Sequence, residues 1–152
     1  MYDTDYMLTH DIDWFFYAGS YLIHAASNQG ILPIMIEERS NSMVQRWVND
    51  LPELNFESDI EVNTKYIEGR LKNMDSNFSS LENYKRTFVN MAKKGLFSFD
   101  RDLSFPEKYV WIARPLKELQ DFNIPVNLYI VQFKGNKQLF NFRIVNDKIE
   151  IE

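Results

Sequence analysis

The residues best suited to chemistry lie within one stretch, residues 9–33, which contains both histidines of the chain, His10 and His24. The same stretch holds a closely spaced acidic pair, Asp11 and Asp13. An aspartate that orients an imidazole ring can make it a general base. Two carboxylates can bind Mg²⁺ or Ca²⁺, which prefer oxygen ligands. Residues 9–33 are therefore the candidate site, with Asp13 and His24 as the candidate catalytic residues.

The aspartate and the histidine can meet only if the chain turns back between them. Aromatic and β-branched residues predict two strands, residues 11–17 and 20–26, joined in a hairpin in which Gly19 can supply the positive φ of the turn. A two-residue turn at residues 18–19 places Asp13 directly opposite His24, and one at residues 19–20 places Phe15 opposite His24 and Asp13 on the diagonal. In both registers Asp13 and His24 share a face, with roughly 4.5–8 Å between their Cβ atoms. A three-residue turn reverses the alternation and sets Trp14 against His24 instead. The contact is thus a hypothesis that depends on the length of the turn.

A purely structural interpretation of these residues competes with the chemical one. A hydrogen-bonded Asp–His pair on a sheet is more often structural than catalytic, and an alternating acidic pair on a strand is more often a solvated edge. The spacing of Asp11 and Asp13 also recurs at positions 3 and 5 and at positions 100 and 102. The spacing alone therefore assigns no metal site.

The motifs that would name a reaction are missing. The sequence contains no G-x-x-x-x-G-K-[ST], no G-x-G-x-x-G, no G-x-S-x-G and no H-E-x-x-H. It also contains no cysteine, which excludes disulfides and thiolate metal sites. These observations favour a non-catalytic protein without a cofactor over an enzyme.

Charge is distributed unevenly along the chain. Residues 1–62 contain 11 acidic residues but only two basic ones, Arg39 and Arg46, although the whole chain has a net charge of −5. Such an acidic stretch repels nucleic-acid phosphates and attracts a basic protein. We expect partner binding at the acids nearest the N-terminus, which are Asp3, Asp5, Asp11 and Asp13. The alternative is that the two halves of the chain lie side by side and neutralise each other.

A second cluster mixes basic and aromatic residues between positions 93 and 114. Such interleaving can bind single-stranded nucleic acid. Here three acids at positions 100, 102 and 107 interrupt the basic residues, and the aromatic spacing suits core packing. We therefore expect no nucleic-acid partner.

Length and composition indicate one domain, residues 1–152. A chain of this length with 45% hydrophobic residues can bury a sizeable core. The acidic, polar N-terminus does not have the pattern of a secretory signal, and no apolar run approaches the ~20 residues of a membrane span. The sequence predicts a soluble, cytoplasmic protein with no membrane partner. Its many Asn and Ile residues are typical of AT-rich coding and indicate a bacterial or phage source.

Hydrophobic periodicity predicts two main helices. The first is residues 41–51, with Ser40 as N-cap and Pro52 as the stop. The second is residues 80–94, with a capping box at its start and Gly95 after its end.

Most of the remaining chain is predicted to be strand. The expected strands are residues 96–99, 109–113, 126–133, 140–144 and 148–151, separated by turns at 134–137 and 146–147. Residues 126–133 are apolar on both faces and are expected to form a central strand. Residues 59–72 stay open between a short strand at 60–62 and a helix at 66–71. The expected fold class is α+β, a mostly antiparallel sheet of the N-terminal hairpin and the C-terminal strands, packed against the two helices.

These observations favour a small acidic protein that binds another protein, as immunity proteins and inhibitors do. That comparison is one of class and not of matched residues. Two alternatives remain. One is a small hydrolase-like enzyme built on Asp11, Asp13 and His24, and the other is a homodimer that pairs through an exposed sheet edge.

Overall fold

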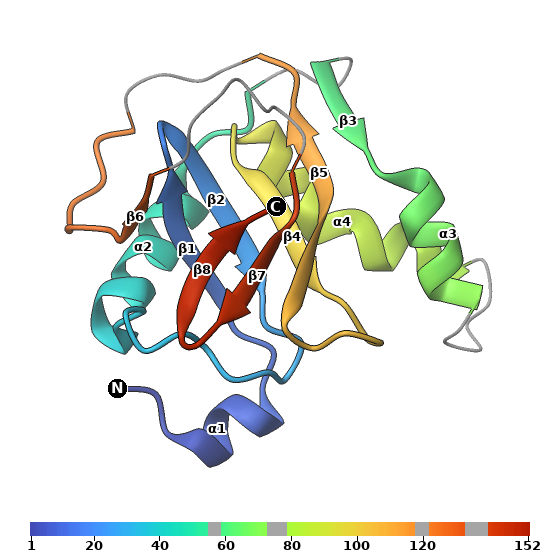
Figure 1. Cartoon of the computed structure of the whole chain (residues 1–152). Coiled ribbons are helices and arrows are strands. Elements are labelled where there is room, and N and C mark those ends of the chain that lie inside the picture. The colour runs from blue at the N-terminus through green and yellow to red at the C-terminus, as the bar shows by residue number, and fades with distance from the viewer. Residues whose placement is uncertain (55–58, 73–78, 118–121, 133–139) are drawn as a thin grey trace.

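The computed structural model describes residues 1–54, 59–72, 79–117, 122–132 and 140–152 (Figure 1). Within these residues the helices are α1 (Thr4–Thr9), α2 (Glu38–Asp50), α3 (Thr64–Lys72) and α4 (Ser79–Lys93). The strands are β1 (Asp13–Ala18), β2 (Tyr21–Ala26), β3 (Ile60–Val62), β4 (Phe97–Arg101), β5 (Lys108–Pro115), β6 (Ile130–Val131), β7 (Phe142–Val145) and β8 (Lys148–Ile151). They form one curved sheet in the order β6-β1-β2-β4-β5-β7-β8, and β3 also pairs with β5.

The α+β class is confirmed, but the sheet is mixed and not mostly antiparallel. β1 pairs in parallel with β6, and β2 pairs in parallel with β4. The chain between β2 and β4 runs through α2, β3, α3 and α4, and this long crossover returns it to the end of the sheet where β2 began. The sequence patterns did not predict α1. They left the helix α3 open as one of two alternatives, because it has few apolar positions.

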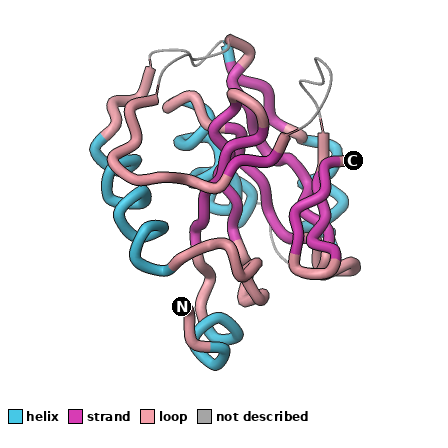
Figure 2. The backbone as a smooth tube through the Cα atoms, turned by 60° about the vertical axis from the view of Figure 1, so that its left-hand side comes forward, coloured by secondary structure: helices cyan, strands magenta, loops and turns pink. Residues whose placement is uncertain are grey.

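Both faces of the sheet are buried, which explains why strand residues of both parities are apolar. On the concave face a core forms around aromatic side chains, among them Trp14, Phe16, Phe99, Tyr109 and Phe142. The other face packs against α2 and α4 (Figure 1). In contrast, α1 lies at one end of the molecule, away from the sheet (Figure 2).

The N-terminal hairpin forms as predicted, with a two-residue turn. Gly19 adopts a positive φ of 58°, and the turn brings Phe15 directly opposite His24. Asp13 then lies opposite Ala26, one diagonal step from His24 on the same face. This is one of the two registers that permit contact between Asp13 and His24.

The two main helices are confirmed with adjusted ends. α4 ends as expected: Gly95 has a φ of 98°, and the N–H groups of Gly95 and Leu96 donate to the carbonyls of Ala92 and Met91. α2 begins at Glu38, three residues before the expected start, and Glu37 is its N-cap. The expectation of Ser40 as N-cap is therefore wrong; its hydroxyl lies in the first turn and donates to the Glu37 carboxylate.

The prediction of a central strand at residues 126–133 is wrong. Among residues 126–132, which the structure describes, only Ile130–Val131 forms a strand, β6, and it lies at the edge of the sheet. Residues 122–129 form instead an extended segment, whose alternate apolar side chains pack against the core beneath α2. Alternating apolar residues are also the pattern of a β-strand, which explains the wrong prediction, although this segment makes few hydrogen bonds to a neighbouring strand. The turn expected at 134–137 lies outside the described residues.

The other predicted elements are present. Residues 59–72 contain both alternatives, the strand β3 followed by the helix α3. At the C-terminus, β7 and β8 form a hairpin in which Asn146 and Asp147 both have positive φ, at 49° and 63°. Two consecutive residues with positive φ make the type of turn that matches strand twist.

Candidate functional site

Asp13 and His24 do meet, and a serine that the sequence did not suggest joins them. The His24 Nε2 atom lies 2.8 Å from the Asp13 Oδ1 atom, and its Nδ1 atom lies 2.5 Å from the Ser98 Oγ atom. Ser98 is beside His24 because β4 pairs in parallel with β2 at this register. The three side chains therefore link β1, β2 and β4 by hydrogen bonds.

The burial of this chain of side chains favours a structural role. His24 and Ser98 have no exposed surface, and the His24 ring packs beside Phe15 and Phe88. A general base or a nucleophile must reach its substrate. Only Asp13 reaches the surface, with a side chain that is 34% exposed. The geometry therefore gives the hydrolase-like alternative no support.

The other acids predicted to bind a partner are exposed, and two of them also stabilise local structure. The Asp3 carboxylate caps α1 by accepting from the Tyr6 N–H at 3.1 Å, and Asp11 accepts from the Asn28 N–H at 2.7 Å. Asp5 lies in the first turn of α1. In the part of the chain that the structure describes, no group of three or more His, Cys, Asp and Glu side chains could hold a metal ion.

His10 is also exposed and takes no part in the Asp13–His24 contact. Its ring stacks on that of Tyr6, with 3.9 Å between the ring centroids. The ring Nδ1 atom lies 3.0 Å from the Tyr6 carbonyl. His10 therefore completes the C-terminal end of α1.

Two basic residues of the second predicted cluster, Lys94 and Arg101, donate to backbone carbonyls, and a third, Arg114, pairs with the Glu61 carboxylate. The Lys94 ammonium donates to the carbonyls of Val48 and Asn49 at the end of α2. The Arg101 guanidinium donates to the carbonyls of Ser27 and Asn28 after β2. This use of the cations gives no support to nucleic-acid binding.

The sequence patterns did not reveal a buried ion pair between α3 and β4. The Arg70 Nη2 atom lies 3.1 Å from the Asp100 Oδ2 atom, and both side chains are about 95% buried. The Tyr84 hydroxyl donates to Asp100 at 2.6 Å, and Arg70 also donates to the Arg101 carbonyl at 2.7 Å. Nearby, the Tyr66 hydroxyl donates to Asp102 at 2.7 Å. Only the fold brings these residues together, since α3 and β4 are separate in sequence.

Burial and hydrogen bonding set the ionisation of this network. Burial raises the pKa of Asp100, although Arg70 and the Tyr84 hydroxyl oppose that shift. Partial burial also acts to raise the pKa of Asp102, but hydrogen bonds from Tyr66 and from two backbone N–H groups lower it overall. A hollow of about 480 Å³ lies beside Tyr66, Arg70 and Asp102.

Burial raises the pKa of five of the eight tyrosines, namely Tyr2, Tyr17, Tyr66, Tyr84 and Tyr109. For Tyr66 the pKa rises from 10.0 to about 12.

The raised pKa of Tyr66 makes the stability of the fold depend on pH. Because the folded-state pKa exceeds the unfolded value, the stability that the neutral Tyr66 hydroxyl contributes is fully present below pH 10.0 and is lost as the pH rises toward the folded value. We expect these tyrosines to ionise together with alkaline unfolding, as measured by tyrosinate absorbance and circular dichroism. Ionisation of all the tyrosines near pH 10 in a folded protein would contradict this.

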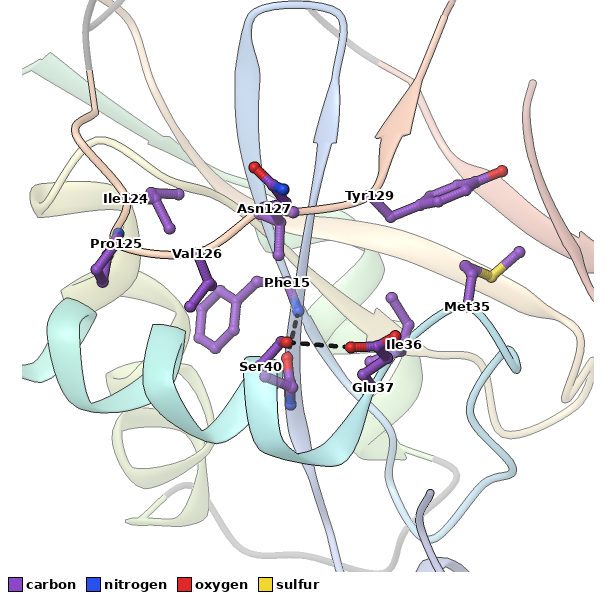
Figure 3. A pocket seen from close by; sticks show the side chains of 12 residues that line it. Phe15, Met35, Ile36, Glu37, Ser40, Ile124, Pro125, Val126, Asn127 and Tyr129 are labelled. Carbon is purple, nitrogen blue, oxygen red and sulfur yellow. Dashed lines mark hydrogen bonds between the residues drawn. The ribbon is translucent and has the colours of Figure 1, made fainter.

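A larger cavity of about 750 Å³ lies between the N-terminal turn of α2, the outer edge of β1 and the extended segment 122–129 (Figure 3). Its apolar wall includes Phe15, Ile36, Ile124 and Val126. Among the twelve described residues that line it, Glu37 is the one charged side chain. The cavity therefore combines apolar walls with one carboxylate.

Asn41 is one of the residues that line this cavity, and its side chain continues the sheet. Its amide oxygen accepts from the Phe15 N–H at 3.1 Å, and its amide nitrogen donates to the Asp13 carbonyl at 2.8 Å. A residue of a parallel strand would bond with the same two groups, at positions i and i+2. Asn41 also donates to the Tyr2 hydroxyl at 2.9 Å and is 3% exposed.

An exposed apolar surface lies at the N-terminal end of the molecule. We call it the N-terminal surface; it consists of Met1, Tyr6, Leu8, Ile31 and Ile34, which are 45–92% exposed. A hollow of about 250 Å³ opens between α1 and residues 31–34. Residues 1–38, which include this surface, contain six acids and no Lys or Arg.

Comparisons of the chain with models of known families, with curated proteins and with solved structures gave no match. In the described residues no helix has the length and apolar character needed to cross a membrane.

Proposed function

We propose that the protein is a non-catalytic module that binds another protein, one with a basic surface, through the N-terminal surface. The observation that supports this proposal is the combination of exposed apolar side chains and acids on one small end of the molecule. Ile34 is 66% exposed and Leu8 is 50% exposed. Exposed apolar groups with a polar rim mark interaction sites, and fields of one sign attract partners of the opposite sign.

The proposal is tested by affinity capture from a lysate of the source cells, followed by identification of the bound protein and calorimetry with that protein. The triple variant Asp3→Asn/Asp5→Asn/Asp11→Asn removes three charges but keeps the local hydrogen bonds, because asparagine also caps helices and accepts hydrogen bonds. We expect it to weaken binding about tenfold, since each exposed ion pair contributes roughly 0.2–1 kcal/mol. Binding of the unchanged protein should also weaken as salt is added.

Two further variants make the result specific to this surface. Ile34→Ser should weaken binding of the same partner without changing the net charge. The matched control Glu53→Gln/Glu68→Gln/Glu150→Gln removes three exposed acids elsewhere and should leave the affinity within about twofold. If the triple variant at Asp3, Asp5 and Asp11 binds the partner as tightly as the control variant does, the proposal is rejected. Light scattering on the protein alone tests the homodimer, which predicts twice 18.1 kDa.

A further inference from the structure

The outer edge of β6 is apolar and exposed. β6 is the last strand at its end of the sheet, and β1 is the one described strand with which it pairs. Ile130 is 52% exposed, and Tyr129 beside it is 38% exposed. The sheet therefore ends in a strand whose side chains face solvent.

The backbone groups of Ile130 point to this outer edge. The carbonyls of the residues on either side, Tyr129 and Val131, both accept from N–H groups of the β1 strand and the turn after it. Successive residues of a strand direct their N–H and C=O groups to opposite edges. The groups of Ile130 are therefore directed away from β1. The same alternation directs those of positions 128 and 132 outward, so the edge presents a row of donors and acceptors.

The segment that carries this edge has no charged residue. Residues 122–132 contain no Asp, Glu, Lys or Arg. At the opposite end of the same sheet, β8 exposes Lys148 and Glu150. Exposed charges and prolines on an edge strand are common devices that prevent two sheets from pairing edge to edge. The β8 edge has such charges, whereas the β6 edge has only Pro125, which precedes its outward groups.

We propose that the β6 edge pairs with the same edge of a second copy of the chain, antiparallel about a twofold axis at Ile130. In this register Tyr129 of each copy lies opposite Val131 of the other. An aromatic residue opposite a β-branched one is a favourable cross-strand pair. Both pairs occupy the non-hydrogen-bonded positions, where side chains on neighbouring strands come closest.

A second copy fits this edge because the edge is complementary to itself. A twofold axis repeats every contact, so the two Tyr129–Val131 pairs form together. No like charges meet at the edge, although each copy has a net charge of −5. The paired segment is short, so we expect a weak dimer, with a dissociation constant of about 0.1–1 mM.

Sedimentation equilibrium of the full chain tests the inference, in a concentration series up to about 1 mM. We expect the mean mass to rise from 18.1 kDa toward twice that value. The Ile130 amide should also exchange with solvent more slowly as the protein concentration rises, because the dimer gives its N–H an acceptor. The Ile144 amide already donates to the Glu107 carbonyl, so its exchange should not depend on concentration in this way.

Charged variants at the twofold axis test the register. Ile130→Lys places two cations opposite each other and Ile130→Glu two anions, so each variant alone should dimerise at least about tenfold more weakly. An equimolar mixture of the two variants should dimerise again, because a cation then lies opposite an anion. Leu103→Lys and Leu103→Glu are the matched controls at another exposed apolar position, and both should dimerise like the unchanged chain. Circular dichroism checks that every variant is folded.

A chain that stays monomeric at the highest concentration would overturn the inference. A dimer that Ile130→Lys leaves intact would also overturn it, as would a mixture of the two Ile130 variants that stays monomeric. Ile130 lies outside the N-terminal surface, so none of these results bears on the proposed function. Conversely, the triple variant at Asp3, Asp5 and Asp11 should dimerise like the unchanged chain.

Discussion

Replacing Arg70 by methionine should lower the free energy of unfolding by about 3–5 kcal/mol at neutral pH, which is the usual effect of removing one partner of a buried ion pair. The variant leaves the Asp100 carboxylate buried without its cation, although the Tyr84 hydroxyl still donates to it. Urea unfolding followed by circular dichroism measures the change. The urea slope should stay constant if the native fold is retained.

The loss of unfolding free energy in the Arg70→Met variant should become smaller at acidic pH. Burial already raises the pKa of Asp100, and loss of Arg70 removes a group that lowers it. A carboxyl group with a higher pKa in the folded state than in the unfolded state stabilises the folded state as the pH falls through the folded value. The Arg70→Met variant should therefore recover part of its stability on acidification.

Two further variants separate the charge from the packing. Arg70→Met/Asp100→Asn removes the uncompensated charge but keeps an acceptor for Tyr84, so it should recover most of the lost stability. Arg86→Met, an exposed arginine of α4, should change stability by less than about 0.5 kcal/mol. If Arg70→Met lowers the free energy of unfolding no more than Arg86→Met does, the Arg70–Asp100 ion pair does not act as a buried structural element.

Replacing Asn41 by alanine should lower the free energy of unfolding by about 2–4 kcal/mol, because it leaves buried polar groups without partners. The amide of Asn41 makes three hydrogen bonds, to the Phe15 N–H, the Asp13 carbonyl and the Tyr2 hydroxyl. Hydrogen exchange gives a residue-specific measurement. The Phe15 amide should exchange faster in the variant, while amides in the centre of the sheet should follow the global loss of stability.

Asn49→Ala is the matched control on the same helix. Asn49 is exposed and accepts one hydrogen bond from Gln45, so its replacement should cost less than about 0.5 kcal/mol. Asn41→Asp is informative as well, since its carboxylate can accept from Phe15 but cannot donate to Asp13. A Phe15 amide that stays protected in both Asn41 variants would show that the side chain does not substitute for a strand.

The sequence was most informative where local chemistry decides structure. The hairpin turn at Gly19 and the end of α4 at Gly95 need positive φ, and the structure confirms both. The contact between Asp13 and His24 followed from the parity of a two-residue turn. Alternation along neighbouring strands is a local property, so no knowledge of the rest of the fold was needed for that prediction.

The sequence failed where distant segments decide the outcome. Ser98 reaches His24, and Arg70 reaches Asp100, only because β4 inserts beside β2 and beneath α3. Residues 126–133 have the apolar pattern of a central strand, but covering a hydrophobic groove beside α2 needs the same pattern. The role of Asn41 was also hidden, because an asparagine within a helix is ordinarily solvated.

The parallel pairing of β2 with β4 has a consequence for the order in which the chain can fold. His24 and its partner Ser98 are 74 residues apart, so the middle of the sheet closes over a long loop. Contacts of such range slow folding, because the chain must lose loop entropy before the contacts form. During synthesis, the apolar hairpin leaves the ribosome well before β4 and has an unpaired edge on each side. We expect this nascent hairpin to be the part of the chain most prone to aggregation, and the part that a chaperone would protect.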